Sequence, residues 1–296
     1  MRIAAAGLAV LAVLLGPPGG LATSGASARG PCGSAPAPAH WKHVIWIWME
    51  NESYDSVIGS RSAPYLTQLA DACGLATGYR AVAHPSLPNY IAATSGGTWG
   101  IGDDAPPSVH PLAQASIFSQ LAERGLTWRA YEESMPTNCD LSSSGAYAVK
   151  HNPAAYYVGI RAACRRFDVS LAALEPDLRR SRLPSFAFVT PNLCDDMHDC
   201  PVAAGDAWLR RFVPAILASP GYRSATTVLF ITFDEGTDPA NHVATVVVSP
   251  STPAGTRAPG RFDHYALLKT TEELLGLPAD LGLARRALGM RAAFHL

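Results

Sequence analysis

An unbroken apolar run near the start of the chain constrains the fold most strongly. Val44–Met49 reads Val-Ile-Trp-Ile-Trp-Met and ends at Glu50 and Asn51. A short run of β-branched and aromatic residues bounded by polar ones is typical of a strand buried on both faces, as in a parallel sheet. Glu50 and Asn51 would then lie at the carboxyl end of that strand, where open α/β sheets bind ligands. They could ligate a cation there, although Asn51 or Ser53 could equally cap a following helix.

The rest of the chain alternates between strand and helix patterns. Strand patterns at 77–83, 127–131, 184–189, 226–233 and 243–248 are separated by helical patterns at 63–73, 88–95, 117–124, 169–180, 204–218 and 265–275. This alternation predicts an α/β fold with a mostly parallel central sheet flanked by helices. The segments 98–113 and 134–165 are predicted to be irregular. With 48% hydrophobic residues, the chain can build one large core, so we expect a single domain over 41–296.

The first 28 residues have the composition of an export signal. Arg2 precedes an apolar stretch, 3–15, that is too short to span a bilayer comfortably, and Ala26-Ser27-Ala28 fits the small-x-small cleavage rule. We therefore expect a signal peptide over 1–28, a flexible lead-in over 29–40 and a secreted protein. An uncleaved N-terminal anchor is the alternative.

All six cysteines follow the predicted cleavage position. An even number in an exported chain suggests disulfides throughout, with several connectivities open. Local spacing favours Cys194–Cys200, and then Cys139–Cys164 and Cys32–Cys73 by elimination. Structural zinc is not expected, because the spacings contain no paired Cys-x-x-Cys. The formal net charge of −1 gives no global basic field for nucleic acid or an anionic membrane.

Ser86 is a candidate nucleophile. It stands between Pro85 and Pro88, just before a predicted helix. The free N–H groups and the dipole of a helix N-terminus can hold a phosphoryl oxygen. Ser86 could also be only the cap of that helix, and the two roles are compatible.

Two adjacent carboxylates, Asp234 and Glu235, directly follow the apolar strand pattern at 226–233. At a buried strand end they repel each other unless a cation or a hydrogen-bond donor neutralises them. With Glu50 and Asn51 they would form an oxygen-rich site, which favours a hard cation over a sulfur-seeking one. The alternative for this pair is a solvated acidic turn.

Six segments in order carry a more specific signal: Met-Glu-Asn-Glu-Ser-Tyr-Asp (49–55), His-Pro-Ser-Leu-Pro-Asn-Tyr (84–90), Lys-His-Asn-Pro (150–153), Pro-Asn-Leu-Cys-Asp-Asp-Met-His-Asp (191–199), Thr-Phe-Asp-Glu (232–235) and the stretch 263–278 that begins Asp-His-Tyr-Ala. Together they resemble the bacterial phosphoesterase family of acid phosphatases and phospholipases C, within the alkaline phosphatase superfamily. Within that family the chain is most similar to the short secreted acid phosphatases.

The resemblance implies an alkaline-phosphatase-like fold and a metal-assisted phosphoric-ester hydrolase that works through a phosphoserine. The implied catalytic residues are Ser86 as nucleophile and His198 as leaving-group acid or as a hydrogen-bond donor to the phosphate. The implied metal ligands are Glu50, Asn51, Ser86, Asp234 and Glu235, and the implied phosphate-pocket residues are Asn89, His151, Asp196 and His264. The cofactor would be one divalent ion: Ca, Mg, Mn or Zn.

The expected substrates are phosphomonoesters, phosphoinositides among them. The irregular segments 98–113 and 134–165 hold few aromatic residues, whereas interfacial surfaces usually expose them beside basic residues. The partners would be phosphorylated small molecules or lipid headgroups, without nucleic acid and without stable membrane insertion. The alternative within the family is a phospholipase C. The alternative from another class is a catalytically silent secreted binding protein, which would not need Ser86 and four metal-type ligands.

Overall fold

The computed structural model describes residues 1–4, 30–278 and 281–296. Within them, eight strands form one sheet in the order β4-β3-β5-β1-β6-β7-β2-β8. Their bounds are β1 (His43–Met49), β2 (Gly74–Ala76), β3 (Trp128–Glu132), β4 (Asp168–Ser170), β5 (Phe186–Thr190), β6 (Thr227–Phe233), β7 (Thr245–Val248) and β8 (Thr256–Ala258). Only β7 runs against its neighbours, β6 and β2. The predicted α/β fold with a mostly parallel sheet is confirmed.

Strand β1 lies near the centre of this sheet, paired in parallel with β5 on one side and β6 on the other. Val44–Met49 has no exposed surface, as expected for a strand covered on both faces. Trp46 packs edge-on against Phe186, and Trp48 stacks on Phe188 with ring centroids 5.6 Å apart. Each such side chain stabilises the fold by about 1.5–3 kcal/mol through burial alone.

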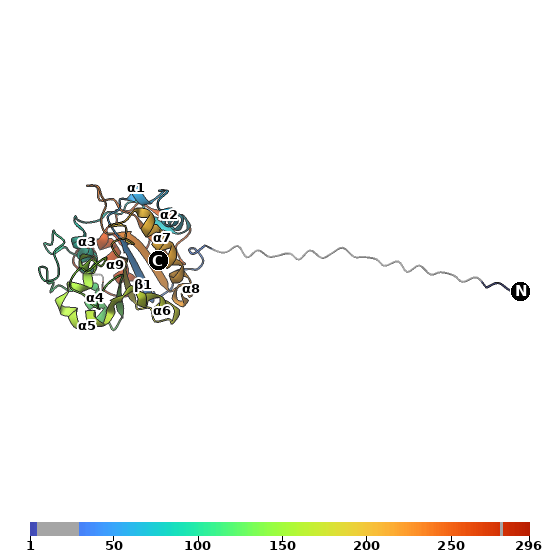
Figure 1. The fold of residues 1–296 in the computed structure, drawn as a ribbon, viewed down its shortest axis with the longest axis horizontal. Coiled ribbons are helices and arrows are strands. Elements are labelled where there is room, and N and C mark those ends of the chain that lie inside the picture. Colours follow the sequence, from blue (N-terminus) through green and yellow to red (C-terminus); the bar gives the residue numbers. More distant parts are fainter. Residues whose placement is uncertain (5–29, 279–280) are drawn as a thin grey trace.

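Helices cover both faces of the sheet. They are α1 (Tyr54–Val57), α2 (Pro64–Ala72), α3 (Ser86–Ser95), α4 (Ile117–Glu123), α5 (Arg161–Phe167), α6 (Leu174–Arg179), α7 (Val202–Leu217), α8 (Pro220–Arg223) and α9 (His264–Leu274). Helix α3 packs on α9 and helix α2 packs on α7, and the two pairs lie on opposite sides of β1 (Figure 1). Every residue of α3 is buried, so its first turn is held firmly beneath the surface.

Two predicted elements are wrong. The strand predicted at 77–83 is irregular, because the N–H groups of Val82 and Ala83 donate to the side chain of Asn89 instead of to a neighbouring strand. The helix predicted at 169–180 begins as strand β4, continues as a 3-10 turn (Leu171–Ala173) and becomes helical only in α6. Pairing of β4 with β3 at the sheet edge overrides the local helical pattern.

The segment predicted to be irregular, 134–165, holds more local structure than expected. It contains three short 3-10 helices, Val149–His151, Pro153–Ala155 and Val158–Ile160, and the beginning of α5. The segment 98–113 contains no helix or strand, as predicted.

The three predicted disulfides, Cys32–Cys73, Cys139–Cys164 and Cys194–Cys200, are all present. The first fastens the lead-in that we expected to be flexible. Pro31 O also accepts from Tyr222 OH at 2.6 Å, and Ala35 N donates to Pro250 O at 3.0 Å. Apart from residues 1–4, the predicted signal peptide lies outside the described residues. Within the described ranges, no helix is both long enough and apolar enough to cross a membrane.

Candidate active site

The carboxyl ends of β1 and β6 bring two carboxylates together. The register pairs Met49 with Phe233, and Asp234 N donates to Met49 O at 3.0 Å. Glu50 and Asp234 therefore leave adjacent parallel strands at the same level, and both are fully buried. Because β1 and β6 run in the same direction, these two predicted metal ligands share one edge of the sheet.

Asn51 and Glu235 join this pair. Asn51 has a left-handed backbone with φ 48°, a conformation that asparagine tolerates better than most residues. The resulting turn aims its N–H at Asp234 Oδ1, 3.0 Å away. One end of its side-chain amide lies 3.2 Å from Glu235 Oε1 and 3.3 Å from Asp234 Oδ1. The predicted oxygen-rich cluster is thus assembled.

Ser86 is the first residue of α3 and faces the carboxylates. Its Oγ lies 3.2 Å from Glu50 Oε2 and 3.4 Å from Glu235 Oε1, and the residue is buried. The hydroxyl therefore stands where a helix N-terminus meets the acidic cluster.

Asn89 determines the path of the chain just before Ser86. Its Oδ1 accepts from Val82 N and Ala83 N, each at 3.0 Å. Its Nδ2 donates to Ala83 O at 3.0 Å and to Pro85 O at 3.1 Å. Both amide hydrogens are therefore used within the chain, so the contacts favour a positioning role over the phosphate contact that the resemblance implies.

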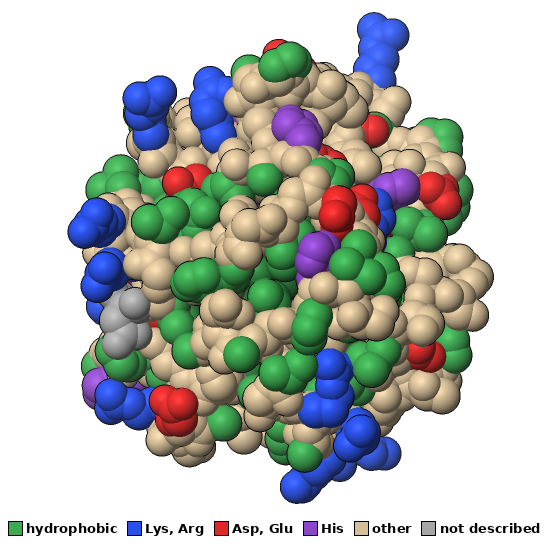
Figure 2. All heavy atoms as spheres, turned by 90° about the vertical axis from the view of Figure 1, so that its left-hand side faces the viewer, with side chains coloured by type: hydrophobic (Ala, Val, Ile, Leu, Met, Phe, Trp, Pro, Cys, Tyr) green, Lys and Arg blue, Asp and Glu red, His purple; other side chains and the backbone are tan. Residues whose placement is uncertain are grey.

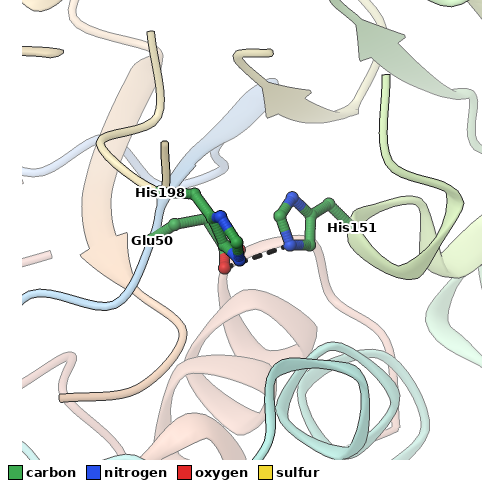
Figure 3. A group of neighbouring side chains, drawn as sticks. All are labelled: Glu50, His151 and His198. Carbon is green, nitrogen blue, oxygen red and sulfur yellow. Dashed lines mark ion pairs between the residues drawn. The ribbon is translucent and has the colours of Figure 1, made fainter. Parts of the chain in front are cut away.

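His151 lies between two buried carboxylates. Its Nε2 is 3.1 Å from Glu50 Oε2, and its Nδ1 is 3.3 Å from Asp196 Oδ2. Its ring stacks on Tyr90, whose hydroxyl donates to Glu50 Oε1. Figure 3 shows His151 reaching Glu50 from the opposite side to His198. Glu50, His151 and His198 each offer an atom within 4.8 Å of the others, so this trio could also hold a metal ion.

His198 is positioned by the loop that follows β5. Its Nδ1 lies 2.7 Å from Asp199 Oδ1, and its backbone N–H donates to Asp196 Oδ1 at 2.8 Å. Met197, between Asp196 and His198, has φ 86°, a strained conformation for a long side chain. Met197 packs closely on α7, where a Cβ at Gly205 would lie 2.4 Å from its Cγ.

His264, the first residue of α9, is fully buried behind Asp234. Its Nε2 lies 2.7 Å from the backbone O of Asp234, and its Nδ1 lies 3.0 Å from Tyr79 OH. Burial lowers the pKa of His264 to about 4, so the ring is neutral at neutral pH. Both nitrogens are engaged by the protein, and the ring holds the backbone at Asp234.

The electrostatics of the cluster fit a cation. Burial raises the pKa of Glu50 well above its ordinary range, and the charge of Asp196 raises it further. Burial likewise raises the pKa of Asp234, and the charges of Glu50 and Glu235 add to the effect. These carboxylates repel one another in a medium of low dielectric constant, and a bound cation would relieve that repulsion. The donor set is mostly oxygen, which suits a hard divalent ion.

Four residues of the site were not assigned roles from the sequence. Tyr90 and His84 belong to the same quoted segment as Ser86, and His84 Nδ1 pairs with Glu235. Lys150 immediately precedes His151. Asp104 lies in the irregular segment 98–113, where no local pattern marks it. Figure 2 shows acidic and histidine side chains beside one another on one face of the molecule.

The fold is similar to that of solved proteins in the alkaline phosphatase superfamily. A solved structure described as a protein in that superfamily from Vibrio parahaemolyticus matches with a TM-score of 0.58. The match covers 90% of this chain and 76% of that chain at 14% sequence identity. At this identity the likeness shows the fold alone, and the fold expected from the sequence is confirmed.

The sequence then identifies the family. The phosphoesterase family model matches residues 60–278, and the chain belongs to that family. Phosphatidylinositol-3-phosphatase of Mycobacterium tuberculosis is 32% identical over 247 residues, which are 83% of this chain and 80% of the relative. An acid phosphatase of Aspergillus fumigatus is 29% identical over 248 residues, 79% of this chain but only 54% of the longer fungal protein. The chain is accordingly a phosphoric-ester hydrolase.

Proposed function

We propose that the protein is a secreted acid phosphatase that hydrolyses phosphomonoesters through a phosphoserine at Ser86. The observation that carries the proposal is the contact of Ser86 Oγ with Glu50 and Glu235 at the start of a buried helix. Phosphoinositides are included among the substrates because the mycobacterial relative is named for one.

The proposal includes one divalent cation, held by Glu50, Asn51, Asp234, Glu235 and the Ser86 oxygen. When bound, such an ion lowers the pKa of the serine hydroxyl and neutralises phosphoryl oxygens. The repulsion among the buried carboxylates supports this assignment. Oxygen ligands suit Ca, Mg or Mn, whereas the adjacent imidazoles would suit Zn.

The chain's own residues account for the transfer of the phosphoryl group. Ser86 Oγ attacks phosphorus and forms the P–O bond of the phosphoserine while the bond to the leaving oxygen breaks. The serine proton has its nearest acceptor in Glu50 Oε2, 3.2 Å away. We assign the proton for the leaving oxygen to His198, because the contact of its Nδ1 with Asp199 Oδ1 at 2.7 Å orients the ring. Water then attacks the phosphoserine with His198 as the base, the bond between phosphorus and Ser86 Oγ breaks, and Glu50 returns the proton to the serine oxygen as phosphate leaves.

Secretion is supported by the cysteines. All six form disulfides, which persist in oxidising compartments and are rare in the cytosol of most organisms. N-terminal sequencing of protein recovered from the medium should begin at Arg29. Retention of the full N-terminus on cell-associated protein would favour the anchor instead.

A substrate panel tests the proposed reaction. Purified protein should release phosphate from p-nitrophenyl phosphate and from a phosphoinositide with a higher kcat/KM than it releases diacylglycerol from phosphatidylcholine. The reverse order would establish a phospholipase C. Absence of hydrolysis of all three substrates, with divalent metals supplied, would favour the silent binding protein.

A further inference from the structure

A salt bridge beside the nucleophile has no role in the function proposed above. Lys150 Nζ lies 3.0 Å from Asp104 Oδ2 and 3.3 Å from His198 Nε2. Asp104 Oδ1 accepts the N–H of Leu87 at 2.9 Å, and Leu87 directly follows the nucleophile in α3. A single carboxylate thus connects the start of α3 with the ammonium group.

The carboxylate of Asp104 has the surroundings that a substrate phosphate needs. A phosphoryl group attacked by Ser86 requires N–H donors at the start of the helix and a cation to balance its charge. Asp104 has both partners, through Leu87 and Lys150. The Lys150 and Asp104 side chains are 20% and 30% exposed, so solvent and ligands can reach the pair.

The ammonium group of Lys150 lies between Asp104 and the catalytic histidine. Its Nζ is 3.0 Å from Asp104 Oδ2 and 3.3 Å from Nε2 of His198, the residue assigned to the leaving oxygen. An anion that entered beside His198 would therefore meet this ammonium group.

A structural role alone does not account for this arrangement. Asp104 caps α3, since Pro85 at the cap position makes no side-chain hydrogen bond. A cap of that kind needs only an acceptor for Leu87 N–H, and the helix dipole already favours its charge. The cap does not require Lys150, and ordering its long side chain against Asp104 costs conformational entropy.

We propose that Asp104 holds the phosphate-binding position while the site is empty, and that a substrate phosphate displaces it and takes over Leu87 N–H and Lys150. This inference rests on the proposed function and deepens it. Because the entering group must replace a charged carboxylate, a phosphomonoester with two charges competes better than a phosphodiester with one. Lys150 is then a substrate-binding residue, and Asp104 a selector for terminal phosphates.

Inhibition by inorganic phosphate tests the proposal, with p-nitrophenyl phosphate as the reporter. Asp104→Asn keeps an acceptor for Leu87 N–H but removes the competing charge, so Ki for phosphate should fall about fivefold. Lys150→Met keeps most of the unbranched apolar side chain but removes the ammonium group, and it should raise Ki about tenfold or more. In both variants KM should change in the same direction as Ki, and by a larger factor than kcat.

A phosphodiester substrate tests whether Asp104 favours monoesters over diesters. The ratio of kcat/KM for p-nitrophenyl phosphate to that for bis(p-nitrophenyl) phosphate should shrink in Asp104→Asn. The neighbouring acid supplies a matched control: Asp103, with a side chain that is 63% exposed, pairs with His110 instead. Asp103→Asn should leave Ki and the ratio unchanged, as should Lys42→Met far along the chain.

A higher or unchanged Ki in Asp104→Asn, or an unchanged Ki in Lys150→Met, would overturn the inference and leave the pair as a helix cap. Asp104→Ser, whose hydroxyl is too short to block the position, decides the matter if the amide variant does not fold. These outcomes differ from failure of the proposed function. If the proposed function were wrong, the wild-type protein itself would neither hydrolyse a phosphomonoester nor bind inorganic phosphate in calorimetry.

Discussion

The two edges of the central sheet differ in how they bury polar groups. At the amino end of β1 a hollow of about 400 Å³ is lined by residues that include Lys42, His43, Gly221, Ser224 and Thr226. The imidazole there is satisfied within the chain, because His43 Nδ1 lies 2.8 Å from Pro184 O. Burial lowers the pKa of His43, which keeps it neutral. The hydroxyl groups of Ser224 and Thr226 likewise donate within the chain, to Gly221 O at 3.1 Å and 3.2 Å.

The carboxyl edge buries charge instead. Glu50 and Asp234 have no exposed surface; burial raises the pKa of both, the charge of Asp196 raises that of Glu50 further, and the charge of Glu50 raises that of Asp234 further. His151 faces Glu50, His84 pairs with Glu235, and the backbone N–H of Asn51 donates to Asp234. These groups balance only part of the negative charge of the three acids. The comparison teaches that a hollow lined by groups that are hydrogen-bonded within the chain gives no sign of chemistry, whereas buried acids that lack sufficient counter-charge do.

The largest difference between the two edges is expected when one hydroxyl group is removed from each. Ser86→Ala should lower kcat by about 10³-fold or more, equivalent to ~4 kcal/mol in the barrier, because no other hydroxyl takes the place of the nucleophile. Ser224→Ala at the amino edge should change kcat less than twofold. Steady-state kinetics on p-nitrophenyl phosphate, with circular dichroism as the check on folding, measure both. More than about a tenth of wild-type activity in Ser86→Ala, only ~1.4 kcal/mol, would exclude it as the nucleophile.

Removing divalent ions should act on the carboxyl edge alone. Dialysis against a chelator is expected to lower activity by about 10²-fold or more and to lower Tm, since an ion that binds only the folded state stabilises it. Elemental analysis before dialysis should find close to one ion per chain. Readdition should restore both properties in the wild type but neither in Asp234→Asn. Full activity in metal-free protein would refute the cation site.

Histidines on the two edges should also respond differently. His198→Ala should lower kcat for an alkyl phosphate by about 10²-fold, within the usual range for a lost general acid. The loss should be smaller with p-nitrophenyl phosphate, whose leaving group needs less protonation. His43→Ala should leave both rates within twofold. Equal losses on the two substrates would give His198 a binding role in place of proton transfer.

The smallest expected effect is on the pH dependence of stability, and it concerns Asp168, a buried acid outside the candidate active site. Burial raises the pKa of Asp168 from an ordinary 3.8 to about 7. Between about pH 4 and pH 7 the carboxyl group of Asp168 is therefore protonated in the folded protein but ionised in the unfolded chain. Its stabilising contribution is complete below about pH 4 and is lost as pH rises through about 7.

Thermal unfolding across pH measures this contribution. Tm should fall between pH 5 and pH 7.5, by about 2–4 °C for each kcal/mol lost. Asp168→Asn should flatten the decline, because its amide can still accept from Asn152 Nδ2 at the 2.7 Å contact. Other buried acids, Glu132 among them, would produce the slope that remains. An identical pH profile in the variant would show that Asp168 does not titrate in this range.

The sequence was informative where one local pattern carried the information. The apolar runs before Glu50 and Asp234 predict strands, and parallel strands bring their carboxyl ends to one edge. Ser86 was marked by its prolines and the helix that follows. These positions depend on a few neighbours along the chain, and the structure brings all three together.

Other features depend on distant contacts. Strands β2, β4 and β8 are three residues long, too short to show a period, and they exist only through pairing with their neighbours. The path of residues 82–85 is set by the side chain of Asn89. Asp104 reaches Leu87 across an irregular segment whose Gly, Pro and Asp residues predict only a loop. No periodicity encodes such contacts.

The close packing of Gly205 against Met197 has a consequence for how this protein tolerates mutation. Gly205 has no functional group, yet even a methyl group there would displace Met197 and, with it, the two site residues on either side. In a saturation screen for phosphatase activity, position 205 should therefore be as intolerant as a position that touches substrate. A helix remote from the nucleophile in sequence would appear in such a map as part of the active site.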